Sequence, residues 1–165
     1  MSHFILTQDQ LKQLLTYDKQ TGSFHWVKRN QRLAGSTNKV QGYRSIHIKG
    51  KNYKCSRLAW LYVYGAMPTH QIDHINHVRG DNRISNLREV TNQENQRNRR
   101  YTGNSSGVIG VCLDKTRNKW KPHIKVDGKL INLGRFDKLE DAVKVRRLAE
   151  VEYGFHTNHG MKLTV

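Results

Sequence analysis

The chain has 165 residues, a formal net charge of +16 and a sequence pI of about 10.2. This length suits one ordinary domain or a few small modules. A charge this basic makes nucleic acid the leading expected partner and an anionic membrane surface the second. No apolar run approaches the roughly 18–20 residues that span a bilayer, and residues 1–10 lack the pattern of a secretory signal. We expect a soluble, cytoplasmic protein without a membrane partner.

The two cysteines, Cys55 and Cys112, lie far apart in the sequence, and neither belongs to a CxxC pair. Structural zinc sites usually draw their ligands from such pairs. We therefore expect no structural zinc, and we expect both cysteines to be free thiols that are partly buried.

Residues 1–54 predict a β-rich segment. Thr7 and Gln10 have the spacing of a capping box at the start of a short helix. Strand-like runs follow, with Lys49-Gly50 as a turn between the last two, at residues 24–28, 43–48 and 51–55. The polar stretch between the first two runs indicates a loop or an extended arm. Because the segment is strongly basic, we expect it to contact DNA.

Residues 55–102 predict a helix followed by a strand–loop–strand–helix unit. Ser56 can cap the first helix. The next three elements are a strand, a polar loop and a strand, at residues 72–75, 76–86 and 87–90. Thr91 and Glu94 form a second capping box, and the helix that they open is expected to reach about Arg100.

Residues 103–165 predict a small module that follows a Gly-Asn-Ser-Ser-Gly linker. Residues 119–126 alternate between apolar and basic side chains, which is typical of a half-buried antiparallel strand. Asp127-Gly128 is a hairpin turn signal. Two further strands are expected at 108–113 and 130–133, and an apolar stripe over 139–153 predicts a helix. We expect a three-stranded antiparallel sheet with one helix, and an α+β fold for the whole chain.

The stretch HQIDHINH, residues 70–77, gathers three histidines around Asp73. On a helix, His70, His74 and His77 would share one face, as zinc-binding histidines can. However, Pro68 precedes them, and the isoleucines between them do not continue a helical stripe. On a strand the three histidines could not converge with Asp73. We therefore favour a strand in which only one histidine has a chemical role.

Phosphodiester cleavage needs a base that activates water and a cation that offsets developing charge. His74 suits the base because the pKa of histidine lies near neutrality. Asp73 offers the hard oxygen that Mg²⁺ prefers, and Asn95 in the following helix could supply a second. Taken singly, each of these residues could equally be an ordinary polar residue of a loop or helix.

The stretch IDHINHVRGDNRISNLREVTNQEN, residues 72–95, resembles the HNH motif of phage-type HNH homing endonucleases. Its landmarks occur in order as Asp73-His74, Asp81-Asn82-Arg83, Ser85-Asn86-Leu87-Arg88 and Glu94-Asn95. The resemblance implies a ββα-metal unit in which His74 is the general base. It also implies that Asp73 and Asn95 hold one Mg²⁺ or Mn²⁺ ion per active site, and that Asn86 holds the loop and helps to orient the base. His70 and His77 match no catalytic position.

The flanking segments carry two more resemblances. YDKQTGSFHW and AGSTNKVQGYRSIHIKGKNYKCSRLAWLYVYG are similar to the part that precedes this nuclease unit, although Ser56 stands where relatives often have histidine. SGVIGVCLDKTRNKWKPHIKVDGKLINLGRFDKLEDAVKVRRLAEVEYG resembles the Apetala-type domain of plant ethylene-response factors. That resemblance implies a sheet that lies in the DNA major groove.

Candidate DNA contacts follow from these patterns. The outer face and turns of the C-terminal sheet carry Lys115, Arg117, Lys119, Lys121, His123, Lys125 and Asn132. Arg97, Arg99 and Arg100 follow Asn95, the second candidate metal ligand, and are expected to bind the DNA backbone near the cut. The alternative for each residue is a merely solvated side chain.

We expect a metal-dependent, site-directed endonuclease that cuts duplex DNA as a monomer or homodimer, and the resemblance implies a phage-encoded one. The main alternative is a non-catalytic, sequence-specific DNA-binding regulator. RNA binding is a third class, but no stacked-aromatic RNA motif is present.

Overall fold

The structure is a computed structural model that describes residues 5–28, 30–98 and 103–161. The chain forms two compact units, residues 1–91 and 92–165. The predicted division into residues 1–54, 55–102 and 103–165 stays a prediction. No helix within the described ranges is long and apolar enough to cross a bilayer.

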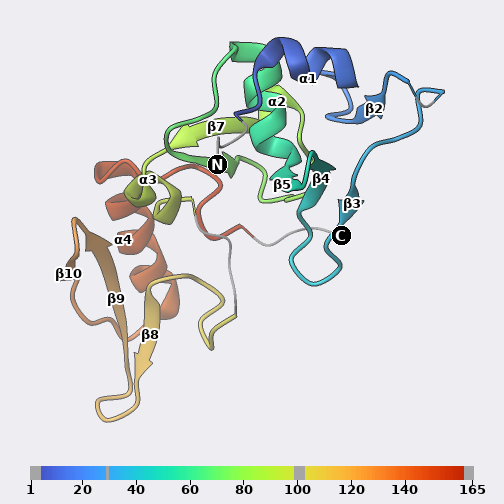
Figure 1. The fold of residues 1–165 in the computed structure, drawn as a ribbon. Coiled ribbons are helices and arrows are strands. Elements are labelled where there is room, and N and C mark those ends of the chain that lie inside the picture. The colour runs from blue at the N-terminus through green and yellow to red at the C-terminus, as the bar shows by residue number, and fades with distance from the viewer. Residues whose placement is uncertain (1–4, 29, 99–102, 162–165) are drawn as a thin grey trace. The chain divides into compact units, whose positions relative to one another are not determined.

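The first unit is built on a leucine-rich core under two helices. Helix α1 (Gln8–Leu14) begins with the predicted capping box, in which Thr7 and Gln10 bond reciprocally. Leu11 of α1 and Leu15, the extended residue that follows the helix, are fully buried and belong to the same core as Leu58 of α2 (Cys55–Tyr64). The two helices lie side by side (Figure 1), and their buried leucines contribute to a single core.

Short antiparallel strands complete this unit. β1 (Leu15–Tyr17) pairs with β2 (Phe24–Trp26). β3 (Ser36–Thr37), β4 (Arg44–Ile48) and β5 (Lys51–Lys54) form a three-stranded sheet in that order. Lys49 and Gly50 both have positive φ, 44° and 80°, as a tight hairpin turn requires, so the turn predicted there is confirmed.

The strand–loop–strand part of the predicted nuclease unit is confirmed. β6 (Gln71–His74) pairs antiparallel with β7 (Leu87–Val90), with Asp73 opposite Arg88. A loop and the 3₁₀ turn η1 (Ile84–Asn86) connect them. Ser56 does not cap α2, however: the N-cap is Lys54, no side chain caps the helix, and Ser56 lies buried in the first turn.

In the second unit, helix α3 (Asn92–Gln96) is shorter than predicted. The amide of Arg97 bonds to Glu94 O as well as Gln93 O, and Asn98 N bonds to Asn95 O. The bonds between residues three positions apart tighten the chain into a turn and end the helix. The predicted end at Arg100 lies outside the described residues.

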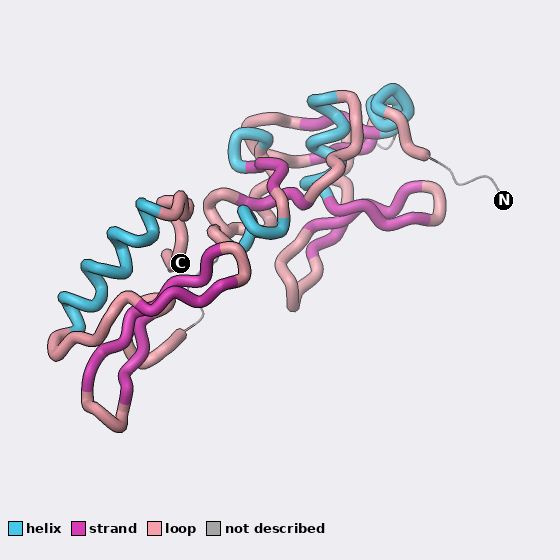
Figure 2. Tube along the Cα trace, turned by 90° about the vertical axis from the view of Figure 1, so that its left-hand side faces the viewer, coloured by secondary structure: helices cyan, strands magenta, loops and turns pink. Residues whose placement is uncertain are grey.

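The C-terminal sheet agrees with the prediction in strand number and pairing. β8 (Val111–Asp114), β9 (Lys119–Val126) and β10 (Lys129–Asn132) are antiparallel, with β9 in the centre. Helix α4 (Leu139–Glu152) covers one face of this sheet (Figures 1 and 2). β8 begins three residues later than predicted because residues 108–111 form a turn in which Gly110 has a φ of +77°. The α+β fold class is confirmed.

Candidate active site

His74 ends strand β6 and is 4% exposed. Its Nε2 lies 3.3 Å from Oδ1 of Asn82, which is also buried. Burial holds the pKa of His74 below its ordinary value, against the opposite effects of the Asn82 hydrogen bond and the Asp73 charge. The ring is therefore neutral near pH 7, which is the protonation state that a general base requires.

Asn82 is itself fixed on two sides. Its Nδ2 donates to Gly80 O at 3.0 Å, and its backbone carbonyl oxygen accepts a 2.7 Å hydrogen bond from the Tyr17 hydroxyl. Burial raises the pKa of Tyr17 to about 12, so the hydroxyl keeps its proton and remains a donor. Sequence reasoning did not find Asn82 as the partner of the histidine; its only signal was the landmark Asp81-Asn82-Arg83.

Asp73 lies beside His74 and is 9% exposed. Arg88 Nε and Nη2 both donate to its Oδ2, at 3.0 and 2.9 Å. The β6–β7 register produces this contact because it sets the two residues opposite each other. Arg88 thus restrains the carboxylate that was predicted to bind metal. A restrained carboxylate offers the kind of oxygen donor that Mg²⁺ or Mn²⁺ takes.

Asn86 closes the loop between β6 and β7. Its Oδ1 accepts from Asn76 N at 3.0 Å, and its Nδ2 donates to Asp81 O at 2.9 Å. The Asp81 carboxylate in turn accepts bonds from Asn76 Nδ2 at 2.7 Å and Arg83 Nη2 at 2.5 Å. Asn86 thus bonds to two points of the loop, and its predicted part in orienting the base stays a prediction.

The other two histidines of the cluster have different surroundings. His70 is exposed, and its backbone amide donates to Glu89 Oε1 at 2.6 Å. His77 occupies a turn with a φ of +64°. Among the described residues, no group of three or more His, Cys, Asp or Glu side chains could hold a metal ion together.

Asn95, the second predicted metal ligand, lies half-buried on α3 in the second unit. Its pairing with Asp73 stays a prediction. Arg97 follows α3, with Nη2 3.5 Å from Asp127 Oδ1 and its guanidinium 5.8 Å from the Phe155 ring centroid. Part of its charge is therefore neutralised within this unit. The predicted contacts Arg99 and Arg100 lie outside the described residues.

The predicted contact residues of the C-terminal sheet are all exposed or half-buried. Lys115, Arg117, Lys125 and Asn132 are exposed, and Lys119, Lys121 and His123 are half-buried. Lys119 Nζ lies 3.2 Å from Asp137, and Arg117 Nη1 lies 3.7 Å from Asp114. Pairs this exposed contribute little to stability, so both cations can exchange a carboxylate for a phosphate at small cost.

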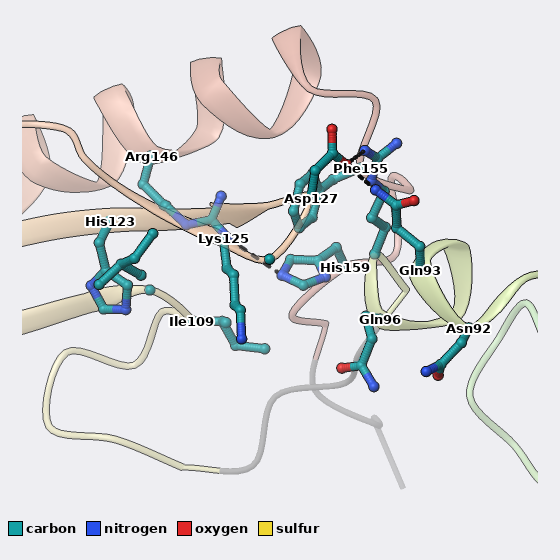
Figure 3. Close-up of a pocket in the computed structure, with 14 residues that line it drawn as sticks. Asn92, Gln93, Gln96, Ile109, His123, Lys125, Asp127, Arg146, Phe155 and His159 are labelled. Carbon is teal, nitrogen blue, oxygen red and sulfur yellow. Dashed lines mark hydrogen bonds and ion pairs between the residues drawn. The ribbon is translucent and has the colours of Figure 1, made fainter.

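A cavity of about 680 Å³ opens within the second unit. Gln93, Lys125 and His159 reach it from α3, β9 and the C-terminal turn (Figure 3). Arg146 lies at its wall, where burial lowers the pKa of the guanidinium, and its Nη1 is 3.2 Å from Glu150 Oε1. The lining is mixed but rich in cationic and amide groups.

Residues 53–97 match the family model described as HNH endonuclease. This range runs from β5 to just past α3 and contains Asp73, His74, Asn86 and Asn95. The segment is therefore an HNH endonuclease domain, and the chain that carries it is a nuclease. A solved structure described as "DNA binding and cleavage by the HNH homing endonuclease I-HmuI" is similar at 24% identity, over 92% of this chain and 94% of that one, with a TM-score of 0.41. No curated protein matches the chain in sequence.

Proposed function

We propose that this chain is a site-directed, metal-dependent DNA endonuclease of the HNH homing type. The observation that carries the proposal is the buried pair His74–Asn82 beside Asp73, within the HNH endonuclease domain. A neutral histidine held next to a restrained carboxylate supplies a base and an oxygen donor at one point, as phosphodiester hydrolysis requires.

His74 acts as the general base in this proposal. In this mechanism Asn82 Oδ1 accepts a hydrogen bond from Nε2, so that Nε2 carries the ring proton and Nδ1 is the basic nitrogen. Nδ1 takes a proton from a water molecule, whose oxygen then attacks the scissile phosphorus. As the new bond from the water oxygen to phosphorus forms, the bond from phosphorus to the 3′ oxygen breaks, and the 3′ oxygen leaves with the electron pair.

Asp73 and Asn95 are the proposed ligands of one Mg²⁺ or Mn²⁺ ion. Carboxylate and amide oxygens are the donors that these hard cations take, and both residues lie inside the HNH segment. The bound ion would offset the negative charge that develops on the phosphate and the leaving oxygen. Arg88 keeps the Asp73 carboxylate in place for this purpose.

The C-terminal sheet and α4 are proposed to act as an Apetala-type DNA-binding module. Its β9 face and turns present cations to the duplex, and the net charge of +16 supports a polyanionic partner. The proposed contacts are Arg97, Arg99, Arg100, Lys115, Arg117, Lys119, Lys121, His123, Lys125 and Asn132.

The test uses purified protein and a pool of genomic duplexes, with cleavage mapped on both strands. We expect cuts at defined positions with Mg²⁺ and none with EDTA. His74→Ala should lose cutting while retaining binding in a gel-shift assay, and His47→Ala, an exposed histidine bonded to Asn52, is the matched control. Cutting by His74→Ala at the wild-type rate would refute the assignment. Specific binding without cuts in any metal would support the regulator instead.

A further inference from the structure

The ring of Tyr43 lies near the candidate base and near two cations of the first unit. Its ring centroid is 5.9 Å from that of His74. Lys54 Nζ stands 4.3 Å from the same centroid, and Arg79 Cζ stands 4.9 Å from it. The three residues around the ring come from β5, β6 and the loop that follows β6, so the fold gathers them from separate parts of the chain.

The cluster is held in place by backbone contacts. Arg79 Nη1 donates to Gln41 O at 3.0 Å, which joins the loop after β6 to the turn between β3 and β4. Asn38 Oδ1 accepts from the amides of Val40 and Gln41, at 3.0 and 2.8 Å, and so fixes this turn. Tyr43 follows directly, which means that its position relative to Arg79 is set by the turn.

The two cations are available to a ligand. Lys54 and Arg79 are both exposed, and neither forms an ion pair with a described residue. The contact of an exposed cation with an aromatic ring is weak, so it orients each side chain without satisfying its charge. The distances through the Tyr43 centroid place each cation within about 11 Å of the His74 ring centroid. This distance equals the rise of about three nucleotides along the duplex axis, at 3.4 Å each.

We propose that Lys54 and Arg79 each bind a DNA backbone phosphate within about three nucleotides of the scissile one, and that Tyr43 positions them. This inference rests on the proposed function, because it takes His74 as the place where the strand is cut. It adds a phosphate-binding site in the first unit, separate from the basic face of the C-terminal sheet. Its role is to fix the position of the cut strand relative to the general base, His74.

The test combines charge removal in the protein with charge removal in the DNA. Duplexes that contain the mapped cut site carry a single neutral methylphosphonate at one of the phosphates around it. Wild-type protein should lose affinity and single-turnover cleavage rate when either contacted phosphate is neutral. Arg79→Gln should be insensitive to one of these positions and Lys54→Gln to the other, because each variant already lacks the contact.

Lys51→Gln is the matched control. Lys51 Nζ makes a similar contact, 5.4 Å from the Tyr53 ring centroid. Lys51 belongs to the same strand as Lys54 but lies three residues before it, and therefore on the opposite face of the strand. This variant should respond to every methylphosphonate as the wild type does. Tyr43→Phe should also keep both sensitivities, whereas Tyr43→Ala should weaken them.

Two results would overturn the inference, and they can be told apart. If the wild type cuts but Arg79→Gln and Lys54→Gln respond like Lys51→Gln at every position, the phosphate contacts are absent and the nuclease assignment stands. If the wild type cuts no duplex in Mg²⁺ or Mn²⁺, the proposed function fails, and the inference fails with it.

Discussion

The His74 Nε2 atom lies 3.3 Å from Asn82 Oδ1, and both side chains are buried. The two residues are eight positions apart, at the two ends of a loop that Asn86 closes. In the proposed mechanism this contact sets the tautomer of the imidazole and the orientation of its second nitrogen. Asn82 is therefore a positioning residue for the proposed base.

Replacing Asn82 by alanine should slow cleavage without weakening DNA binding. The ring loses the acceptor that fixes it, and a misoriented base costs roughly 10-fold or more in rate. The Tyr17 bond ends on the Asn82 backbone carbonyl, so the loop keeps that anchor in the variant. Asn52→Ala, which removes an exposed Asn–His contact of 3.0 Å, is the control and should cut normally. Equal single-turnover rates for the two variants would contradict the positioning role.

Gly22→Ala should destabilise the first unit more than Gly50→Ala does. Both glycines have positive φ, +72° and +80°, so either alanine carries the backbone strain of about 1–2 kcal/mol. Only at Gly22 would a Cβ also overlap its surroundings, meeting Asn82 C at 2.5 Å and the amide of Arg83, whereas nothing lies within 4 Å at Gly50. Urea unfolding should show a difference of about 1 kcal/mol or more between the variants. Identical urea midpoints would mean that the loop around Asn82 shifts to accommodate the added Cβ without loss of stability.

Sequence patterns predicted the structural elements that depend on interactions between residues close together in the chain. β7 and β9 have the predicted bounds because their alternation and turn residues lie within the segments themselves. The capping box at Thr7 is a contact over three residues, and it was predicted for the same reason. The end of α3 could not be predicted, because the tightening bonds of Arg97 and Asn98 do not follow from residue type.

The candidate site divides in the same way. Asp73 and His74 stand out in the sequence because they are adjacent and carry the right chemistry. The contacts of Asn82 with His74 and of Tyr43 with Lys54 and Arg79 depend on how loops cross in space. No spacing in the sequence encodes them, so only the structure could identify these residues.

Asp73 and Asn95 should act as a pair if they hold one ion. Asp73→Asn and Asn95→Ala are each expected to raise the Mg²⁺ concentration for half-maximal cleavage by more than about 10-fold. The double variant should be much less impaired than the product of the single effects, because the first change already removes the shared ion. Mn²⁺ binding gives a second readout, and Asn92→Ala, an exposed residue of the same helix, is the control. Effects that multiply in full would mean that the two residues do not share a metal.

The β9 face should contribute to DNA affinity through phosphate contacts. Removing one contacting cation lowers the slope of log K against log salt concentration by about 0.9. We expect this change for Lys121→Gln, whose side chain belongs to the central strand. Lys144→Gln removes an equal charge from an exposed position of α4 and should leave the slope unchanged. If both variants shift the slope equally, the sheet has no specific part in binding.

Asp81 should make the stability of the first unit depend on pH. Hydrogen bonds from Arg83 lower the pKa of the Asp81 carboxyl, and Asn76 adds to the effect. A carboxyl whose pKa is lower in the folded state stabilises that state above its unfolded pKa of about 3.9. This stabilisation is lost as the pH falls from there through the folded pKa. The urea midpoint of the wild type should therefore exceed that of Asp81→Asn most at pH 5–7, and the gap should narrow below about pH 4. A gap that stays constant down to pH 2 would show that Asp81 contributes through packing rather than through its charge.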